Sequence, residues 1–71
     1  MDTIDAFYNG IEKDVKDANT KTRLSLNKRR GRQFIKDISK NKFASKDMIK
    51  KAISKNKKIE VLIKKRMKKI K

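Results

Sequence analysis

Residues 21–27 read Lys-Thr-Arg-Leu-Ser-Leu-Asn, and the secondary structure of this stretch decides the fold. Leu24 and Leu26 alternate with polar side chains, a period of two that is typical of a strand with one apolar and one polar face. A single strand cannot satisfy its own backbone donors and acceptors. The segment is therefore predicted to pair with the same segment of a second subunit, which favours a homodimer.

Helical patterns surround this stretch. In residues 3–18 apolar side chains recur at three- and four-residue spacing, which predicts an amphipathic helix. Further helices are expected in residues 28–41, 45–56 and 57–70, and the last two either break at Asn56 or continue as one helix. The expected fold is mainly α, with an N-terminal helix in 1–20, a strand-helix-helix core in 21–56 and a basic helical extension in 57–71.

Several classes of protein are excluded by the composition. A chain of 71 residues buries only a thin core, which again favours association. It has no Cys and no His, so thiol nucleophiles, zinc-thiolate sites and the commonest general base are missing. No apolar run reaches the length of a membrane span. We expect a soluble, cytoplasmic protein (or one inside a host cell, if viral) that is not an enzyme and has no metal or cofactor.

Charge is distributed unevenly along the chain. The formal net charge is +15, from 23 Lys and Arg against 8 Asp and Glu. Residues 1–20 hold five acidic and two basic side chains, whereas residues 21–71 hold 21 basic and three acidic ones. Such a surface attracts a polyanion, because neutralising phosphates releases counterions. A simpler explanation of the lysine content is a solvated surface encoded by an AT-rich genome, in which lysine codons are favoured. That explanation does not account for the scarcity of acidic residues after residue 20.

The strand and second helix together resemble the ribbon-helix-helix family of DNA-binding repressors. The resemblance rests on the alternating stretch Arg23-Leu24-Ser25-Leu26-Asn27 and on Ala44-Ser45-Lys46-Asp47-Met48-Ile49-Lys50-Lys51-Ala52-Ile53, and it covers about half of the chain. It implies an intersubunit antiparallel ribbon that enters the major groove of double-stranded DNA. The implied function is a sequence-specific transcription regulator, a repressor of a plasmid or virus, that acts as a homodimer. Whether its dimers assemble further on DNA is left open by the sequence.

The resemblance also assigns roles to residues. The base-reading side chains would be Lys21, Arg23, Ser25 and Asn27. The phosphate-binding residues would be Lys28, Arg29, Arg30, Arg32, Ser45 and Lys46, with Ser45 also capping its helix. The dimer core would contain Leu24, Leu26, Phe34, Ile38, Met48, Ile49, Ala52 and Ile53.

Two other functions remain open. In the first, residues 21–27 form a loop of an all-helical protein that binds nucleic acid without reading its sequence. In the second, the basic amphipathic C-terminal helix lies on an anionic membrane. The aromatic residues of the helices are expected to pack in the core rather than to stack on bases. Phe7, Tyr8 and Phe34 follow helical apolar stripes, and Phe43 precedes a helix cap, where it is expected to pack back onto that helix.

Overall fold

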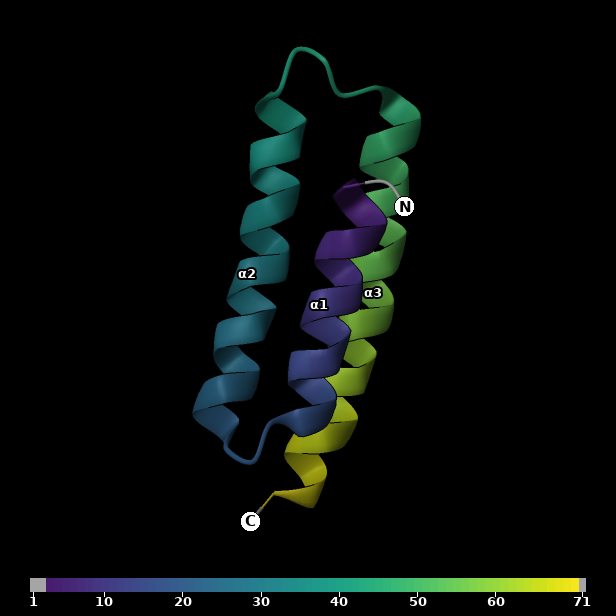
Figure 1. Ribbon diagram of the computed structural model, residues 1–71. Helices are drawn as coiled ribbons and strands as arrows, with labels where there is room; N and C mark the ends of the chain where they lie inside the picture. Colours follow the sequence, from purple (N-terminus) through teal and green to yellow (C-terminus); the bar gives the residue numbers. More distant parts are fainter. Residues whose placement is uncertain (1–2, 71) are drawn as a thin grey trace.

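The computed structural model describes residues 3–70, which fold into three helices (Figure 1). Helix α1 is Thr3–Asp17, α2 is Lys21–Lys40 and α3 is Lys46–Lys69. The loop of residues 41–45 joins α2 to α3, these two helices run antiparallel, and α1 lies against both (Figure 1). The bundle measures 42 × 21 × 14 Å, and no helix in residues 3–70 is long and apolar enough to cross a bilayer.

The strand prediction for residues 21–27 is wrong. These residues form the first two turns of α2, and residues 3–70 contain no strand, so the ribbon of the ribbon-helix-helix fold is absent there. Thr20 caps the helix, because its side-chain Oγ1 accepts a hydrogen bond from the Arg23 N–H at 3.2 Å. A helix satisfies its own backbone groups within one chain, whereas the strand needed a second subunit.

Burial along α2 follows the helical repeat rather than an alternation. The buried residues are Leu24, Asn27, Gly31 and Ile38. Leu24 is fully buried, but Leu26 is 43% exposed, so the two leucines do not share a face. Two other residues of the expected dimer core, Met48 and Ile53, are also exposed, while Ile38 and Ala52 lie in the core of the single chain. The alternation seen at Leu24 and Leu26 thus covered too few residues to reveal the helical spacing of 3.6 residues that burial follows along α2.

Helix α3 is continuous through Asn56, so the two C-terminal helices run on as one. Ser45 caps its start, and the Ser45 hydroxyl accepts from the Met48 N–H at 3.2 Å. Asn56 is 5% exposed and faces the interior rather than ending the helix.

An aromatic cluster joins α1 to α2. Phe7 and Phe34 stack with ring centroids 4.2 Å apart, and Tyr8 meets both rings edge-on. The interpretation of these three residues as packing residues is confirmed. Tyr8 donates its hydroxyl to the Gly31 carbonyl at 3.1 Å. Burial, and next the negative charge of Glu60, raise the pKa of Tyr8 to about 12, so this donor keeps its proton at neutral pH.

The three helices approach each other closely at Gly31. A Cβ atom on Gly31 would clash with Asn56 Oδ1, and the Tyr8 ring would lie 3.8 Å from the same Cβ atom. The absence of a side chain at this position therefore lets Tyr8 of α1 and Asn56 of α3 meet α2 at one level.

The two glycines should respond oppositely to alanine. Gly10→Ala should raise the free energy of unfolding by about 0.5–1 kcal/mol, because alanine favours helix and its Cβ meets no atom within 4 Å. Gly31→Ala should lower it, since displacing buried Asn56 costs about 1–3 kcal/mol and exceeds the propensity gain. Urea denaturation followed by circular dichroism measures both. Equal stabilisation by the two changes would contradict the close approach.

Candidate nucleic-acid interface

The three helices differ strongly in charge. Helix α1 carries four acidic and two basic side chains, whereas α2 carries eight basic and one acidic, and α3 carries eleven basic and two acidic. The bundle therefore places one acidic helix against two strongly basic ones.

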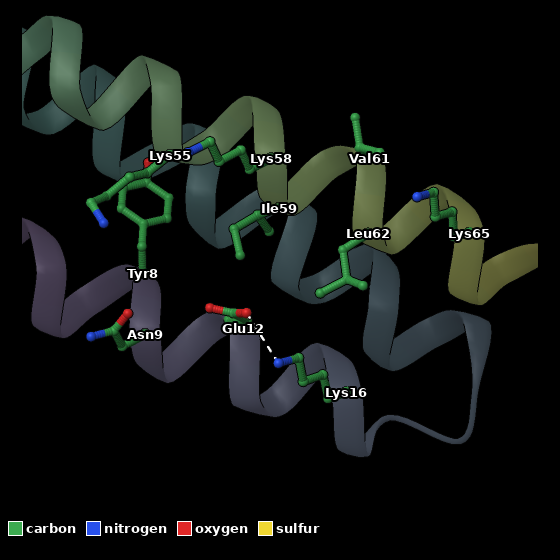
Figure 2. Close-up of a pocket in the computed structure, with 10 residues that line it drawn as sticks. All are labelled: Tyr8, Asn9, Glu12, Lys16, Lys55, Lys58, Ile59, Val61, Leu62 and Lys65. Carbon is green, nitrogen blue, oxygen red and sulfur yellow. Dashed lines mark ion pairs between the residues drawn. The ribbon is translucent and has the colours of Figure 1, made fainter.

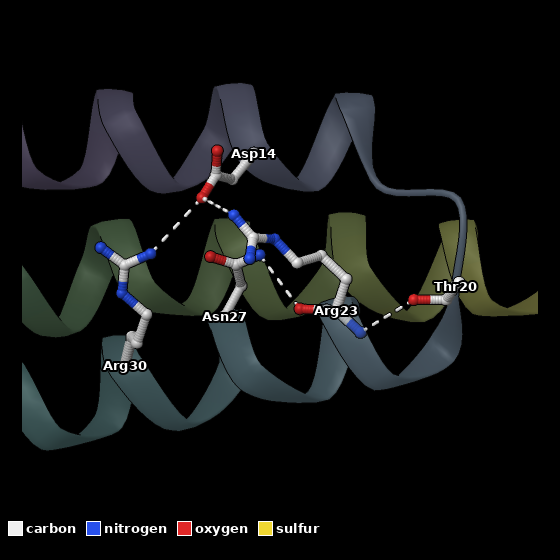
Figure 3. A network of polar contacts seen from close by, with 5 residues as sticks. All are labelled: Asp14, Thr20, Arg23, Asn27 and Arg30. Carbon is white, nitrogen blue, oxygen red and sulfur yellow. Dashed lines mark hydrogen bonds and ion pairs between the residues drawn. The ribbon is translucent and has the colours of Figure 1, made fainter.

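The acids of α1 pair with basic side chains on the near sides of α2 and α3. Asp14 Oδ2 lies 3.3 Å from an Arg23 nitrogen and 3.4 Å from an Arg30 nitrogen, so one carboxylate serves two guanidinium groups (Figure 3). Asp5 pairs with Lys51 at 3.0 Å and with Lys55 at 2.9 Å. All of these pairs are partly exposed, so each contributes little to stability. They do identify the sides of α2 and α3 that face α1.

The far sides of α2 and α3 can be located from the helical repeat. Successive residues turn by about 100°, so residues two apart point in nearly opposite directions. Arg30 pairs with Asp14 of α1, whereas Arg32 donates two hydrogen bonds to Glu60 Oε1 of α3, at 3.0 and 2.8 Å. The Arg32–Glu60 pair thus marks a seam between α2 and α3 on the side away from Asp14.

Lysines flank this seam on both helices. Lys28 of α2 and Lys64 of α3 line the same shallow hollow of about 420 Å³, together with Glu60. Steps of four or seven residues from these positions reach further exposed cations on the same sides of the helices. We name the set the basic face, and its members are Lys21, Lys28, Arg32 and Lys36 of α2 and Lys46, Lys50, Lys57, Lys64 and Lys68 of α3.

The basic face is long and lightly neutralised. Lys46 and Lys68 are separated by 22 helical residues, or about 33 Å at 1.5 Å per residue. That length is close to one turn of B-DNA. Among the described contacts, the acid within this seam is Glu60. Its carboxylate already pairs with Arg32 and accepts a hydrogen bond from the Asn56 side-chain amide, which lies 3.1 Å from Glu60 Oε2. The lysines on either side of Glu60 are therefore available to an external anion.

The residues expected to read bases do not share a surface. Asn27 is fully buried, and its amide donates to the Arg23 carbonyl at 3.1 Å (Figure 3). The Arg23 guanidinium is directed to Asp14 of α1. Lys21 and Ser25 are exposed and border a shallow hollow on the outside of α2. Base contact by these four residues through a ribbon is thus not possible in this fold.

The residues expected to bind phosphate divide into three groups. Lys28, Arg32 and Lys46 lie on the basic face. Arg30 pairs with Asp14, and Arg29 borders the outer hollow of α2. Ser45 caps α3 through its hydroxyl.

Six members of the basic face were not among the individual residues predicted from the sequence to bind phosphate. They are Lys21, Lys36, Lys50, Lys57, Lys64 and Lys68, and Lys21 had been assigned to base contact instead. The signal was the spacing of lysines along residues 46–68, which places them on one side only if α3 is a single helix.

A second groove lies between α1 and α3, with a volume of about 330 Å³ (Figure 2). Its apolar floor includes Ile59 and Leu62, and Lys58 and Lys65 stand on its α3 side (Figure 2). On the α1 side Lys16 is paired with Glu12 at 3.1 Å (Figure 2). Residues 3–70 contain no group of three or more His, Cys, Asp or Glu side chains that could hold a metal ion.

No protein-family model, curated protein or solved structure matches this chain, so no relative supplies a function for it.

Proposed function

We propose that this chain is a non-catalytic, all-helical protein that binds nucleic acid without reading its base sequence, inside a cell or a host cell. The observation that carries the proposal is the basic face, where nine cations on two antiparallel helices surround one acid, Glu60. Lysines spread over such a surface gain affinity by neutralising phosphates and releasing their counterions, which is independent of sequence.

The breadth of the face supports contact with the backbone rather than with base edges. Two packed helices lie about 8–10 Å apart, and each is about 10–12 Å wide with its side chains. Their combined width is greater than the roughly 12 Å of a major groove, which admits one helix or one ribbon. The basic face would therefore lie across phosphates, where side chains fix position but carry no sequence information.

The membrane-surface alternative is less well supported by the packing. It required an apolar side of the C-terminal helix to enter the lipid. The apolar residues Ala52, Ile59 and Ile63 of α3 are instead buried in the bundle. The basic face would meet anionic headgroups mainly through its charges, since Val61 is the exposed apolar side chain that borders its hollow.

The salt dependence of binding tests the proposal. If about six of the nine cations contact phosphates, the slope of log K against log salt should be near −5 for a duplex. Fluorescence anisotropy with two unrelated duplexes of equal length gives both the slope and the sequence dependence. We expect equal affinities within about threefold. A slope shallower than about −2, or a tenfold preference for one sequence, would overturn the proposal, and stronger binding to anionic vesicles than to either duplex would favour the membrane.

A further inference from the structure

One aromatic ring stands outside the core. Phe43, in the loop between α2 and α3, is 93% exposed, although it was expected to pack back onto the following helix. The chain's other aromatic residues, Phe7, Tyr8 and Phe34, pack against one another. Phe43 is therefore the most exposed of the four rings, and a partner can reach it without any change in the core.

The loop presents this ring on a hydrogen-bonded turn. The Asn41 N–H donates to the Ile38 carbonyl at 3.2 Å, and the Asn41 carbonyl accepts from the Ala44 N–H at 3.2 Å. The Asn41 side-chain Oδ1 accepts from the Phe43 N–H at 2.9 Å. Because the backbone on both sides of Phe43 is bonded, a ligand would lose little affinity to ordering of the loop.

A hollow of about 320 Å³ adjoins the ring. Its walls are largely apolar and include Ile4 of α1 and Phe34, Ile38, Phe43, Ala44 and Met48, so the hollow lies between the loop and the start of α1. Asp37 and Asn41 supply polar groups at the same hollow. A flat, heteroaromatic ligand with hydrogen-bonding edges suits this combination of an exposed ring, apolar walls and a few polar groups.

The surroundings of the ring are basic. Lys40, Lys42 and Lys46 all lie within three residues of Phe43, and Lys46 is the first residue of the basic face on α3. A strand that follows the basic face to Lys46 and then turns over this end of the bundle, toward α1, would bring its next base to Phe43.

We propose that Phe43 stacks on an unpaired nucleobase of a strand held by the basic face. This inference rests on the proposed function. Base–aromatic stacking tolerates any base, because every base has a π-face, so the proposal is consistent with binding that ignores sequence. The lysines supply the attraction to the backbone, and Phe43 adds a preference for unpaired over paired bases.

Substitution at Phe43 tests the proposal. Phe43→Ala should weaken binding of a single-stranded oligonucleotide about tenfold, within the 5- to 150-fold range typical of one stacked base. The salt slope should not change, because no phosphate contact is lost. The affinity of Phe43→Leu for the same oligonucleotide should be nearly as low as that of Phe43→Ala, since leucine keeps apolar surface but has no π-face. Leu26→Ala, at another exposed apolar residue that does not line the hollow beside Phe43, serves as the matched control and should bind normally.

A spectroscopic readout is available because the chain contains no tryptophan. Phe43→Trp introduces a single indole whose fluorescence should be quenched when a single strand binds, and much less when a blunt duplex binds. Normal affinity of Phe43→Ala together with an unquenched Trp would overturn the stacking proposal while leaving the proposed function intact. Failure of the unsubstituted protein to bind any oligonucleotide would overturn both.

Two other outcomes would also contradict the stacking proposal. An equal loss of duplex and single-strand affinity in Phe43→Ala would make Phe43 a wedge between paired bases. Conversion of a dimer to a monomer by the same substitution, seen by sedimentation without oligonucleotide, would make the loop a contact between two copies of the chain.

Discussion

Replacing Lys28, Lys57 and Lys64 together by glutamate should lower the affinity for a duplex about 100-fold at roughly 0.1 M salt. These three lysines flank the Arg32–Glu60 seam at the middle of the basic face. Loss of three phosphate contacts should reduce the salt slope by about 2.7, and the new carboxylates add repulsion. Anisotropy titrations at several salt concentrations measure both quantities.

A matched variant separates the location of charge from its amount. Lys13→Glu, Lys58→Glu and Lys65→Glu together change the net charge equally, but Lys13 is on α1, and Lys58 and Lys65 border the α1–α3 groove. Repulsion at long range is screened within about 8–10 Å at this ionic strength. We therefore expect the affinity of this control variant for the duplex to fall by less than about fivefold. Similar losses in both variants would mean that binding follows net charge, and the assignment of the basic face would fail.

Some of the fold could be predicted from the sequence because the local signals agreed with one another. The apolar stripe that begins at Ile4 predicted a helix in residues 3–18, and α1 is Thr3–Asp17. Ser45 was expected to cap a helix, and its hydroxyl does so. The expected helices 28–41 and 45–56 left a short connection between them, and the α2–α3 loop lies there. Each of these features depends on contacts within a few residues.

The errors came from features that depend on contacts between helices. Gly31 and Asn56 are an example, because asparagine favours turns and Asn56 was taken as a possible break between two helices. In the bundle they meet each other, and the small residue on α2 makes room for the polar side chain of α3. A sequence pattern does not show that two such residues, 25 positions apart, are neighbours. The basic cluster 28–32 was likewise taken as one site, although Arg30 and Arg32 face different helices.

Leu24 and Leu26 provide the sharpest test of the helix against the strand. On one face of a strand, both leucines would be buried equally. In α2, Leu24 is fully buried and Leu26 is 43% exposed. Leu24→Ala should therefore lower the free energy of unfolding by about 3 kcal/mol, through lost burial and the cavity that remains. Leu26→Ala should lower it by less than about 1 kcal/mol.

The size of the first effect makes the comparison decisive. A chain of this length has a total stability of roughly 4–10 kcal/mol, so Leu24→Ala removes a large part of it. Urea denaturation followed by far-ultraviolet circular dichroism gives both free energies, and repeating it at several protein concentrations tests for a linked dimer. Comparable losses from the two substitutions, together with a midpoint that rises with concentration, would restore a paired strand. A large loss at Leu24 alone, independent of concentration, is the result expected of a helix whose core lies within one chain.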